Sequence, residues 1–244
     1  MSMSGRKGHY GVDAPYVPAL MIVGAIACAA LGLWSGSHGW WISFLIFALL
    51  AAVYLHTTLR GKFVTWRKLF DARAWRGDED VLDLGCGRGA VLLMAADYVP
   101  QGRAIGVDIW SRKDQSGNAM IVAQKNAELE GVADRVQWHT ADMRQLPLPD
   151  EGFDVVVSSV AIHNIPTRSG RDQAIDEAWR VLRPGGHLLI ADISKAEEYR
   201  QRLATRGGTA IRRDLGWQMW WGAPWMATAL VEVYKPDRAD KTPA

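Results

Sequence analysis

The residues with the clearest chemical potential are a glycine-rich turn and a carboxylate that follows it. The stretch "VLDLGCGRGA" (81–90) has the pattern of a strand, a tight turn and the start of a helix, and Asp108 lies 19 residues beyond Gly89. Glycines in such a turn let the backbone approach a bound nucleotide, and the carboxylate can accept hydrogen bonds from ribose hydroxyls. The pattern predicts a nucleotide site, and a nicotinamide dinucleotide would fit it as well.

Three further features distinguish between the possible nucleotides. Asp83 lies two residues before Gly85, where a carboxylate would repel a pyrophosphate but would suit a cationic ligand that carries an amino acid group. Asp142, after a third strand pattern, is placed to accept a hydrogen bond from an adenine amino group. The chain also contains a single nucleotide-binding half, whereas a dinucleotide fold repeats it. These features favour a cationic nucleoside over a dinucleotide.

The elements that must position these residues alternate between strands and helices from residue 80 onward. Strand patterns occur at 80–84, 103–110, 135–143, 153–165, 187–193, 209–215 and 226–234. Helical patterns occur at 89–99, 118–132, 171–182 and 195–207. Such alternation predicts an α/β fold with a mostly parallel sheet covered by helices on both faces, and ligands bind at the carboxyl ends of its strands.

Four ordered motifs in this half of the chain resemble those of class I S-adenosylmethionine-dependent methyltransferases. They are "VLDLGCGRG", "GVDIW", "ADMRQLPLPDEGFDVVVSS" and "VLRPGGHLLIADI", and the resemblance covers about residues 78–236. The similarity is to the branch that methylates quinones and other small molecules. It implies a Rossmann-like, seven-stranded, mostly parallel sheet with an antiparallel last strand, and S-adenosyl-L-methionine as the cofactor.

The resemblance also implies which residues hold that cofactor. They are Asp83, Gly85, Cys86, Gly87, Asp108, Ile109, Asp142, Met143 and Ser158. Cys86 is interpreted as a small residue in a tight turn rather than as a nucleophile. The stretch 110–118 is longer than usual for the family, so Trp110 and Asn118 are further candidates for contact with cofactor or substrate.

Methyl transfer from a sulfonium is an in-line displacement, to which a protein contributes mainly by positioning the reactants. A general base is needed only when the acceptor must lose a proton. His163, with Asn164, is the candidate because the loop after the fourth strand opens over the methyl group in this fold. The alternative is that His163 orients the loop. No Cys/His cluster has the spacing of metal ligands, so no metal is predicted.

The first sixty residues have a different composition from the rest. Residues 14–59 contain no Asp, Glu, Lys or Arg. Two apolar segments, 17–35 and 40–58, are joined by "GSHG", and each approaches the ~30 Å that a helix needs to cross a bilayer. This predicts a transmembrane helical hairpin. A signal peptide, a buried helical pair and a re-entrant or interfacial hairpin are the alternatives.

Basic residues at both ends of this region predict its orientation. Arg6 and Lys7 precede the first segment, and residues 60–76 carry a net charge of +5, so both ends and the catalytic domain are expected in the cytoplasm, at the cell membrane. Residues 60–76 also have an apolar stripe with basic flanks. A helix of this kind could lie on anionic headgroups or pack against the following domain.

The tryptophans gather in one short stretch near the C-terminus. "GWQMWWGAPW" (216–225) contains Trp217, Trp220, Trp221 and Trp225, and it connects the last two expected strands at the mouth of the site. Tryptophan favours membrane interfaces. The stretch is therefore interpreted as a rim that dips toward the bilayer or a lid over an apolar substrate, with packing against 60–76 as the alternative.

Five regions follow from these patterns. They are an N-terminal tail (1–16), a transmembrane hairpin (17–58), a basic amphipathic juxtamembrane helix (59–77), a methyltransferase domain (78–236) and a C-terminal tail (237–244). The predicted function is methylation of a small hydrophobic acceptor, such as a lipid, a quinone-like phenol or a thiol, by a membrane-anchored enzyme. A silent cofactor-binding membrane module, serving as sensor or scaffold, and a nicotinamide-dependent reductase are the alternatives. Nucleic acid is disfavoured as a partner because residues 77–244 have a net charge of −4.

Overall fold

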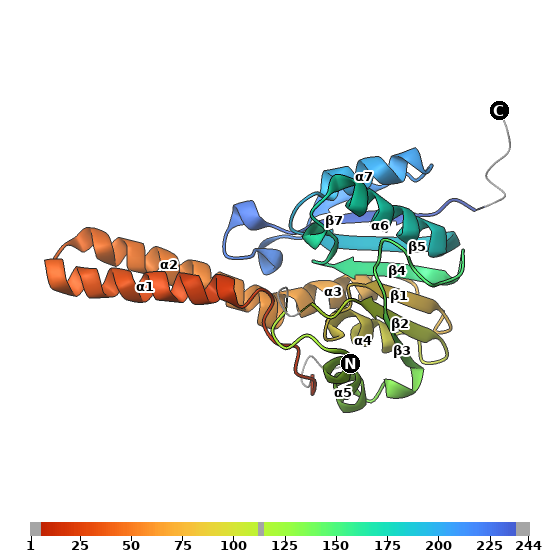
Figure 1. Ribbon diagram of the computed structural model, residues 1–244, viewed down its shortest axis with the longest axis horizontal. Coiled ribbons are helices and arrows are strands. Elements are labelled where there is room, and N and C mark those ends of the chain that lie inside the picture. Colours follow the sequence, from red (N-terminus) through yellow and green to blue (C-terminus); the bar gives the residue numbers. More distant parts are fainter. Residues whose placement is uncertain (1–5, 112–114, 238–244) are drawn as a thin grey trace.

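The computed structural model describes residues 6–111 and 115–237, which form an α/β domain with a long helical hairpin projecting from one end (Figure 1). The remaining residues, 1–5, 112–114 and 238–244, lie outside the described part. Most of the expected C-terminal tail is among them, as are the first five residues of the N-terminal tail.

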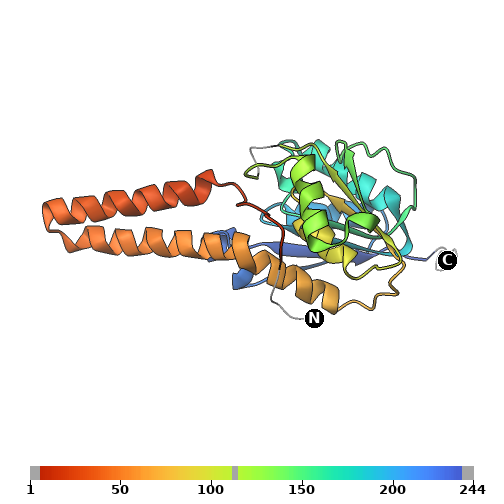
Figure 2. The same ribbon diagram turned by 90° about the horizontal axis from the view of Figure 1, so that it is seen from below.

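The hairpin consists of helices α1 (Tyr16–Ser35) and α2 (His38–His56), which run side by side in both views (Figures 1 and 2). Small residues of α1 (Ala25, Cys28 and Gly32) are buried in the hairpin, where they allow the two backbones to approach closely. The outward faces carry large exposed apolar side chains: Leu20, Val23, Ile26, Leu33, Ile42, Leu45 and Leu49, among others. By length and composition, both helices are able to cross a membrane.

The second helix does not end where the apolar segment ends. A π-helical turn, η1 (Thr57–Gly61), joins α2 directly to α3 (Lys62–Asp71), so the chain stays helical from His38 to Asp71. The apolar stripe of α3, Phe63, Trp66 and Phe70, is buried against the α/β domain. The stripe is thus covered by protein, as the packing interpretation expected, and contact of the basic flanks with lipid headgroups stays a prediction.

Seven strands form one sheet in the order β3-β2-β1-β4-β5-β7-β6. The strands are β1 (Asp80–Leu84), β2 (Arg103–Asp108), β3 (Val136–Thr140), β4 (Phe153–Ser159), β5 (Leu182–Asp192), β6 (Ile211–Asp214) and β7 (Ala229–Tyr234). Strands β1 to β5 pair in parallel, and β7 is antiparallel to both β5 and β6. The predicted seven-stranded sheet with an antiparallel last strand is confirmed.

Helices cover both faces of the sheet, as the alternating pattern predicted (Figure 1). The remaining helices are α4 (Ala90–Ala96), α5 (Met120–Glu130), α6 (Arg168–Val181) and α7 (Ala196–Thr205), with short turns η2 (Ala133–Arg135), η3 (Ile162–Asn164), η4 (Trp217–Met219) and η5 (Pro224–Met226). Alternate strand residues divide the core into two layers. Val155 and Val157 pack under α3 and α4, whereas Val156 packs under α6 and α7.

Candidate functional site

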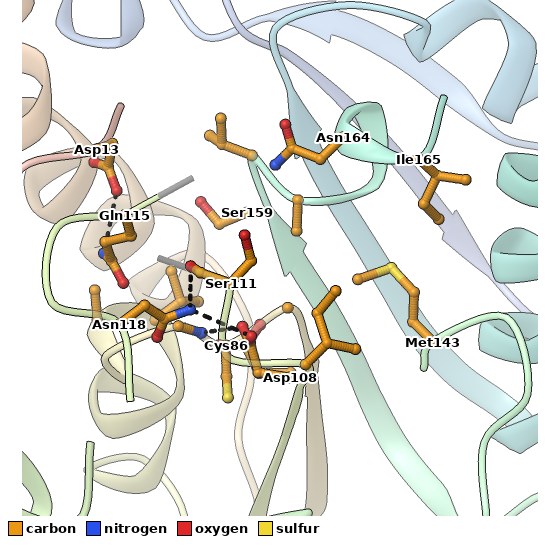
Figure 3. A pocket seen from close by; sticks show the side chains of 18 of the residues that line it. Asp13, Cys86, Asp108, Ser111, Gln115, Asn118, Met143, Ser159, Asn164 and Ile165 are labelled. Carbon is orange, nitrogen blue, oxygen red and sulfur yellow. Dashed lines mark hydrogen bonds between the residues drawn. The ribbon is translucent and has the colours of Figure 1, made fainter. Parts of the chain in front are cut away.

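The carboxyl ends of the central strands surround a cavity of about 390 Å³. Most of the residues expected to hold a cofactor line it: Asp83, Gly85, Cys86, Gly87, Asp108, Ile109, Asp142 and Met143. Trp110 does not line it, but Asn118 and Asn164 do. The strand order β3-β2-β1-β4 brings the third-strand loop, Asp108, the glycine turn and the end of β4 to one edge of the sheet. Figure 3 shows Met143, Asp108, Cys86 and Ser159 around the cavity.

The backbone of the glycine turn adopts a conformation that leaves no room for side chains. Gly85 and Gly87 have φ values of +75° and +52°, and a Cβ atom added to Gly85 would lie 2.3 Å from the Cβ of Ala161. The N–H of Gly87 donates to Oδ2 of Asp108 at 2.8 Å. The turn thus forms a narrow cradle whose shape depends on glycine, and Asp108 holds it in place.

Asp83 is a fully buried acid in the cavity wall. Its side chain is 1 % exposed, and Oδ1 has no hydrogen-bond partner among the described residues. Burial, together with the nearby charge of Asp108, raises the pKa of the Asp83 carboxyl to about 8. Burial also raises the pKa of the Cys86 thiol, which keeps it protonated and a poor nucleophile. A cationic group beside Asp83 would supply the missing partner.

Asp108 and Asp142 differ in how they are held. Asp108 Oδ1 accepts from the backbone N–H of Trp110 at 2.6 Å and from Nδ2 of Asn118 at 3.3 Å. Asp142 accepts from Nε of Arg144 at 2.9 and 3.0 Å, and these hydrogen bonds hold its pKa below the usual range. Asp142 lies at the edge of the cavity, where its expected contact with adenine stays a prediction.

The end of β4 presents Ser159 rather than the expected Ser158 to the cavity. The side chain of Ser158 is buried and donates to the carbonyl of Leu84 at 2.8 Å. Ser159 Oγ accepts from Nε1 of Trp66 at 2.9 Å. Successive side chains of a strand point to opposite faces of the sheet. The hydroxyl of Ser159 therefore faces the cavity, and the hydroxyl of Ser158 points away from it.

A second cavity, of about 240 Å³, adjoins the first and shares Asp13, Val160 and Asn164 with it. Its other walls come from three places: the base of the hairpin (Ala14, Tyr16, Val17, Tyr54), the ends of β4 and β5 (His163, Ile193), and the β6–β7 connection (Trp221, Met226). Val160, at the junction of the two cavities, has a φ of +54°, which is strained for a β-branched residue. The second cavity is mostly apolar and aromatic.

His163 lines the second cavity and is held by an acid behind it. Its Nδ1 lies 2.6 Å from Oδ1 of Asp192, and its backbone N–H donates to Oδ2 at 3.0 Å. The hydroxyl of Tyr199 also donates to Oδ2, at 3.1 Å, and burial raises the pKa of that hydroxyl, so it stays a donor. Asn164 lies beside His163 on η3 and faces both cavities.

The tryptophan loop, residues 215–228 between β6 and β7, packs against the base of the hairpin. Trp221 is 2 % exposed, donates to Oγ1 of Thr228 at 2.9 Å and contacts the ring of Tyr54 edge-on. Trp217 stacks on His56, and the hydroxyl of Thr57 donates to the carbonyl of Trp220. The loop thus contacts residues 54–61 and also α3, which includes part of the segment 60–76 that the packing interpretation named.

Two rings of the same loop stay largely exposed, although one of them, Trp217, stacks on His56 with one face. Trp217 is 55 % exposed and Trp225 is 80 % exposed. Packing of the loop through Trp221 is therefore observed, whereas its interpretation as a rim that dips toward the bilayer or as a lid stays a prediction. Trp221 alone among its four tryptophans lines a described cavity.

The sequence patterns did not predict the N-terminal strap, residues 6–13, which lies along α5 and the first cavity. Glu130 Oε1 accepts from the backbone of Gly8 at 2.9 Å and from the hydroxyl of Tyr10 at 2.8 Å. At the end of the strap, Asp13 pairs with Lys62, and both line the first cavity. The base of the hairpin is therefore built into the site.

Residues 82–190 match the family described as methyltransferase domain. This segment, a little under half of the chain, is similar to the domain of S-adenosylmethionine-dependent methyltransferases. Among curated proteins, it is 32 % identical over 131 residues to the ubiquinone/menaquinone biosynthesis C-methyltransferase UbiE of Roseobacter denitrificans, covering 53 % of this chain and 49 % of that one. It is 34 % identical over 118 residues to the sterol 4-C-methyltransferase strm-1 of Caenorhabditis elegans, covering 48 % and 32 %. The chain thus spans about half the length of the first relative, and less of the second.

Solved structures share the fold of the methyltransferase domain at low identity. Geranyl diphosphate C-methyltransferase from Streptomyces coelicolor A3(2), solved with S-adenosyl-L-homocysteine, superposes with a TM-score of 0.57 and 15 % identity, covering 73 % of this chain and 80 % of that one. The [4+2]-cyclase SpnF superposes with a TM-score of 0.59 and 20 % identity, covering 72 % and 82 %. Because one of these is named a cyclase, the fold by itself does not fix the reaction.

Proposed function

We propose that this chain is a membrane-anchored methyltransferase that transfers a methyl group from S-adenosylmethionine to a small hydrophobic acceptor. The observation that carries the proposal is the second cavity. It adjoins the cofactor cavity at Val160 and Asn164, and its outer walls belong to the base of an apolar hairpin and to the tryptophan loop. An apolar acceptor would thus reach the reacting centre from the side of the molecule that faces the bilayer.

The first cavity fits the cofactor in charge and shape. Asp83 carries a buried oxygen that lacks a partner among the described residues, next to a glycine cradle that any Cβ would fill. Asp108 would hold the ribose, Ile109 would flank the adenine, and Asp142 would meet the adenine amino group. When bound, S-adenosylmethionine supplies an electrophilic methyl group on a positively charged sulfur.

His163 is proposed as the general base for an acceptor that must lose a proton. Asp192 Oδ1 lies 2.6 Å from Nδ1, within ion-pair distance but outside hydrogen-bond geometry, and we propose that Nε2 accepts the proton. Tyr199 and the backbone of His163 fix the Asp192 carboxylate in turn, so Asp192 is a positioning residue. This arrangement suits a phenol, a thiol or an activated C–H group better than an amine that already carries a lone pair.

Membrane anchoring is proposed from the exposed surface of the hairpin. Its outward residues are large and apolar over most of both helices, and in water this surface would cost about 25 cal/mol for each Å² left exposed. Basic side chains at the domain end, Arg6 and Arg60, are exposed and match a cytoplasmic placement of both ends. The exposed rings of Trp217 and Trp225 lie on the loop that packs at this same end.

The experiment uses detergent-purified full-length protein with methyl-labelled S-adenosylmethionine. Organic-soluble and water-soluble fractions of a bacterial extract are offered separately, and an Asp108→Asn variant controls for cofactor-dependent labelling. Label in an organic-soluble product supports the proposal. Label confined to water-soluble products contradicts the hydrophobic acceptor, and stoichiometric cofactor binding without any transfer supports a silent binding module instead.

A further inference from the structure

We infer that Lys62, at the base of the hairpin, binds the carboxylate of the cofactor's methionine part, and that Asp13 positions it. This inference rests on the proposed function in one respect, the identity of the cofactor. It makes the membrane anchor a part of the cofactor site. Both residues lie outside the segment 82–190 that matches the methyltransferase family, so the family match itself does not assign this contact.

The charges that line the first cavity are unevenly distributed. Four acids line it: Asp13, Asp83, Asp108 and Asp142. The cations among its described lining residues are Lys62 and Arg144. The methionine part of the cofactor carries both an ammonium and a carboxylate, so it needs an anion and a cation at the same end of the cavity. Asp83 provides the anion, and the position of each cation decides which of them meets the carboxylate.

Arg144 lies at the wrong end for this role. It forms hydrogen bonds with Asp142 beyond the end of β3, where the adenine is expected. The strand order then places the ribose at Asp108 on β2 and the methionine part at the glycine turn after β1. The carboxylate must therefore lie toward β4, on the far side of the turn from Arg144.

Lys62 lies at that far side. Trp66, four residues further along the same helix, donates to Ser159 at the end of β4, which fixes α3 beside this strand. Asp13 accepts from Nε2 of Gln115 at 3.2 Å, and Oε1 of Gln115 accepts from the backbone N–H of Arg88 in the glycine turn at 3.0 Å. Figure 3 shows Asp13 and Gln115 together on the side of the cavity opposite Met143 and Ile165.

The ammonium of Lys62 has donors left to bind a second anion. Lys62 is 5 % exposed, and Nζ lies 2.6 Å from Oδ2 of Asp13, the one carboxylate that the described residues place within ion-pair distance. That same oxygen also accepts from the hydroxyl of Thr58 at 2.6 Å. An ammonium has three N–H donors, so Asp13 leaves donors for a ligand in the cavity that Lys62 lines. A charge-assisted hydrogen bond in such a buried place is strong.

The ion pair also closes the base of the hairpin. Asp13 precedes α1 and Lys62 follows α2, so the pair joins the two ends of the apolar segment directly above the glycine turn. The hydroxyl of Tyr54, on α2, adds a hydrogen bond to the carbonyl of Asp13 at 2.9 Å. The position of Lys62 in the cavity thus depends on the closed hairpin.

The test measures binding by the full-length protein in detergent, with two probes. S-Adenosylhomocysteine has the carboxylate, and its decarboxylated analogue lacks only that group. Wild-type protein should prefer the carboxylate form by about tenfold or more, and Lys62→Met should abolish most of this preference by weakening that form alone. Lys62→Arg should retain part of the preference. Lys68→Met, on the exposed face of the same helix, should change neither affinity.

Several outcomes would overturn the inference. Equal losses for both probes in Lys62→Met would assign Lys62 a structural role, and an unchanged preference would place the carboxylate elsewhere. Because Lys62→Met leaves the Asp13 carboxylate unpaired, the double variant Asp13→Asn/Lys62→Met repeats the test without a buried charge. A wild-type protein that binds both probes equally overturns the inference alone, whereas one that binds neither probe overturns the proposed cofactor as well.

Discussion

Asp83 is the residue whose charge state is expected to govern cofactor binding. Its pKa of about 8 means that the carboxyl is protonated at neutral pH in the free protein. A cationic ligand favours the ionised form and lowers this pKa, so binding should release a proton below pH 8. Affinity for S-adenosylhomocysteine should therefore rise between pH 6 and pH 8 and level off above. Calorimetry at pH 7 in buffers of different ionisation enthalpy should detect release of about one proton.

The control for this prediction is Asp83→Asn, which keeps the shape of the side chain but cannot ionise. It should weaken binding and remove the proton release. Proton uptake by the wild-type protein at pH 7, or the same release from the variant, would show that Asp83 stays protonated in the complex.

His163 is expected to affect turnover and not cofactor affinity. Removal of a general base typically lowers the rate by about 10²–10⁴-fold, so His163→Ala should lower kcat on this scale for a phenolic or thiol acceptor. Asp192→Asn should lower kcat by less and shift the pH profile, because Asp192 positions the ring. The matched control is His139→Ala, since His139 lies in β3 and lines neither described cavity. Full activity of His163→Ala at every pH would assign His163 to loop structure alone.

Much of the first cavity could be predicted from residue types and spacing. Local motifs identify the glycine turn and the carboxylates that follow each strand, because backbone constraints fix what those positions can be. The motifs could not decide between Ser158 and Ser159, which differ by one position in the pleat. The pair of Asp13 and Lys62 was missed although its signal is present. The two residues are the first charges on either side of the apolar hairpin apart from the exposed Arg60, and a hairpin brings its ends together.

At the scale of elements, the close approach of the tryptophan loop to the hairpin depends on Gly61. A Cβ atom on Gly61 would lie 1.9 Å from the carbonyl oxygen of Gln218, so Gly61→Ala must displace the loop or the helix. Overpacking of this kind costs about 1–3 kcal/mol of folding free energy. We therefore expect a lower thermal midpoint and reduced turnover, measured by thermal unfolding in detergent and by methyl transfer.

The matched control is Gly39→Ala in the same continuous helix, where the nearest atom to an added Cβ is Oγ of Ser37 at 3.7 Å. Alanine there should change stability by no more than about 1 kcal/mol, in the favourable direction expected from helix propensity. If both variants unfold alike, the contact between Gly61 and Gln218 does not hold the loop.

The exposed rim of the tryptophan loop gives a second prediction for this element. Trp225→Glu places a charge on a ring that is 80 % exposed, so it should leave the fold and the affinity for S-adenosylhomocysteine unchanged. It should weaken turnover of a bilayer-dissolved acceptor several-fold, because a carboxylate is repelled from anionic headgroups. Ile121→Glu, on the exposed surface of α5, is the control. If the two substitutions lower turnover equally, Trp225 does not contact the membrane in the way proposed.

The helices and strands themselves could largely be predicted from the sequence, but the way they connect and pack could not. Period-two and helical patterns located the strands and helices because each pattern reflects burial on one face or two. The helix that runs through the π turn at Thr57–Gly61 was not predicted, because its continuity depends on contacts with Trp220 and Asp13 that lie far away in the sequence. The sequence also did not determine what the apolar stripe of α3 contacts. In the structure, Trp66 and Phe70 pack under the α/β domain.

At the scale of the whole molecule, the base of the hairpin and the α/β domain line the same two cavities. The hairpin projects from the domain at the end where the tryptophan loop and the second cavity lie (Figures 1 and 2). The strap and α3 bring both ends of the hairpin back to the first cavity. Anchoring and catalysis are therefore expected to depend on each other, and we predict that the acceptor arrives through the membrane rather than through water.

The most direct test places full-length protein in vesicles and adds methyl-labelled S-adenosylmethionine outside. The organic-soluble fraction of a bacterial extract is dissolved either in the same vesicles or in separate vesicles without protein. We predict rapid labelling when protein and acceptor share a bilayer and much slower labelling when they do not. Equal rates in the two arrangements would show that the acceptor reaches the site through water, and would contradict the proposed route along the hairpin.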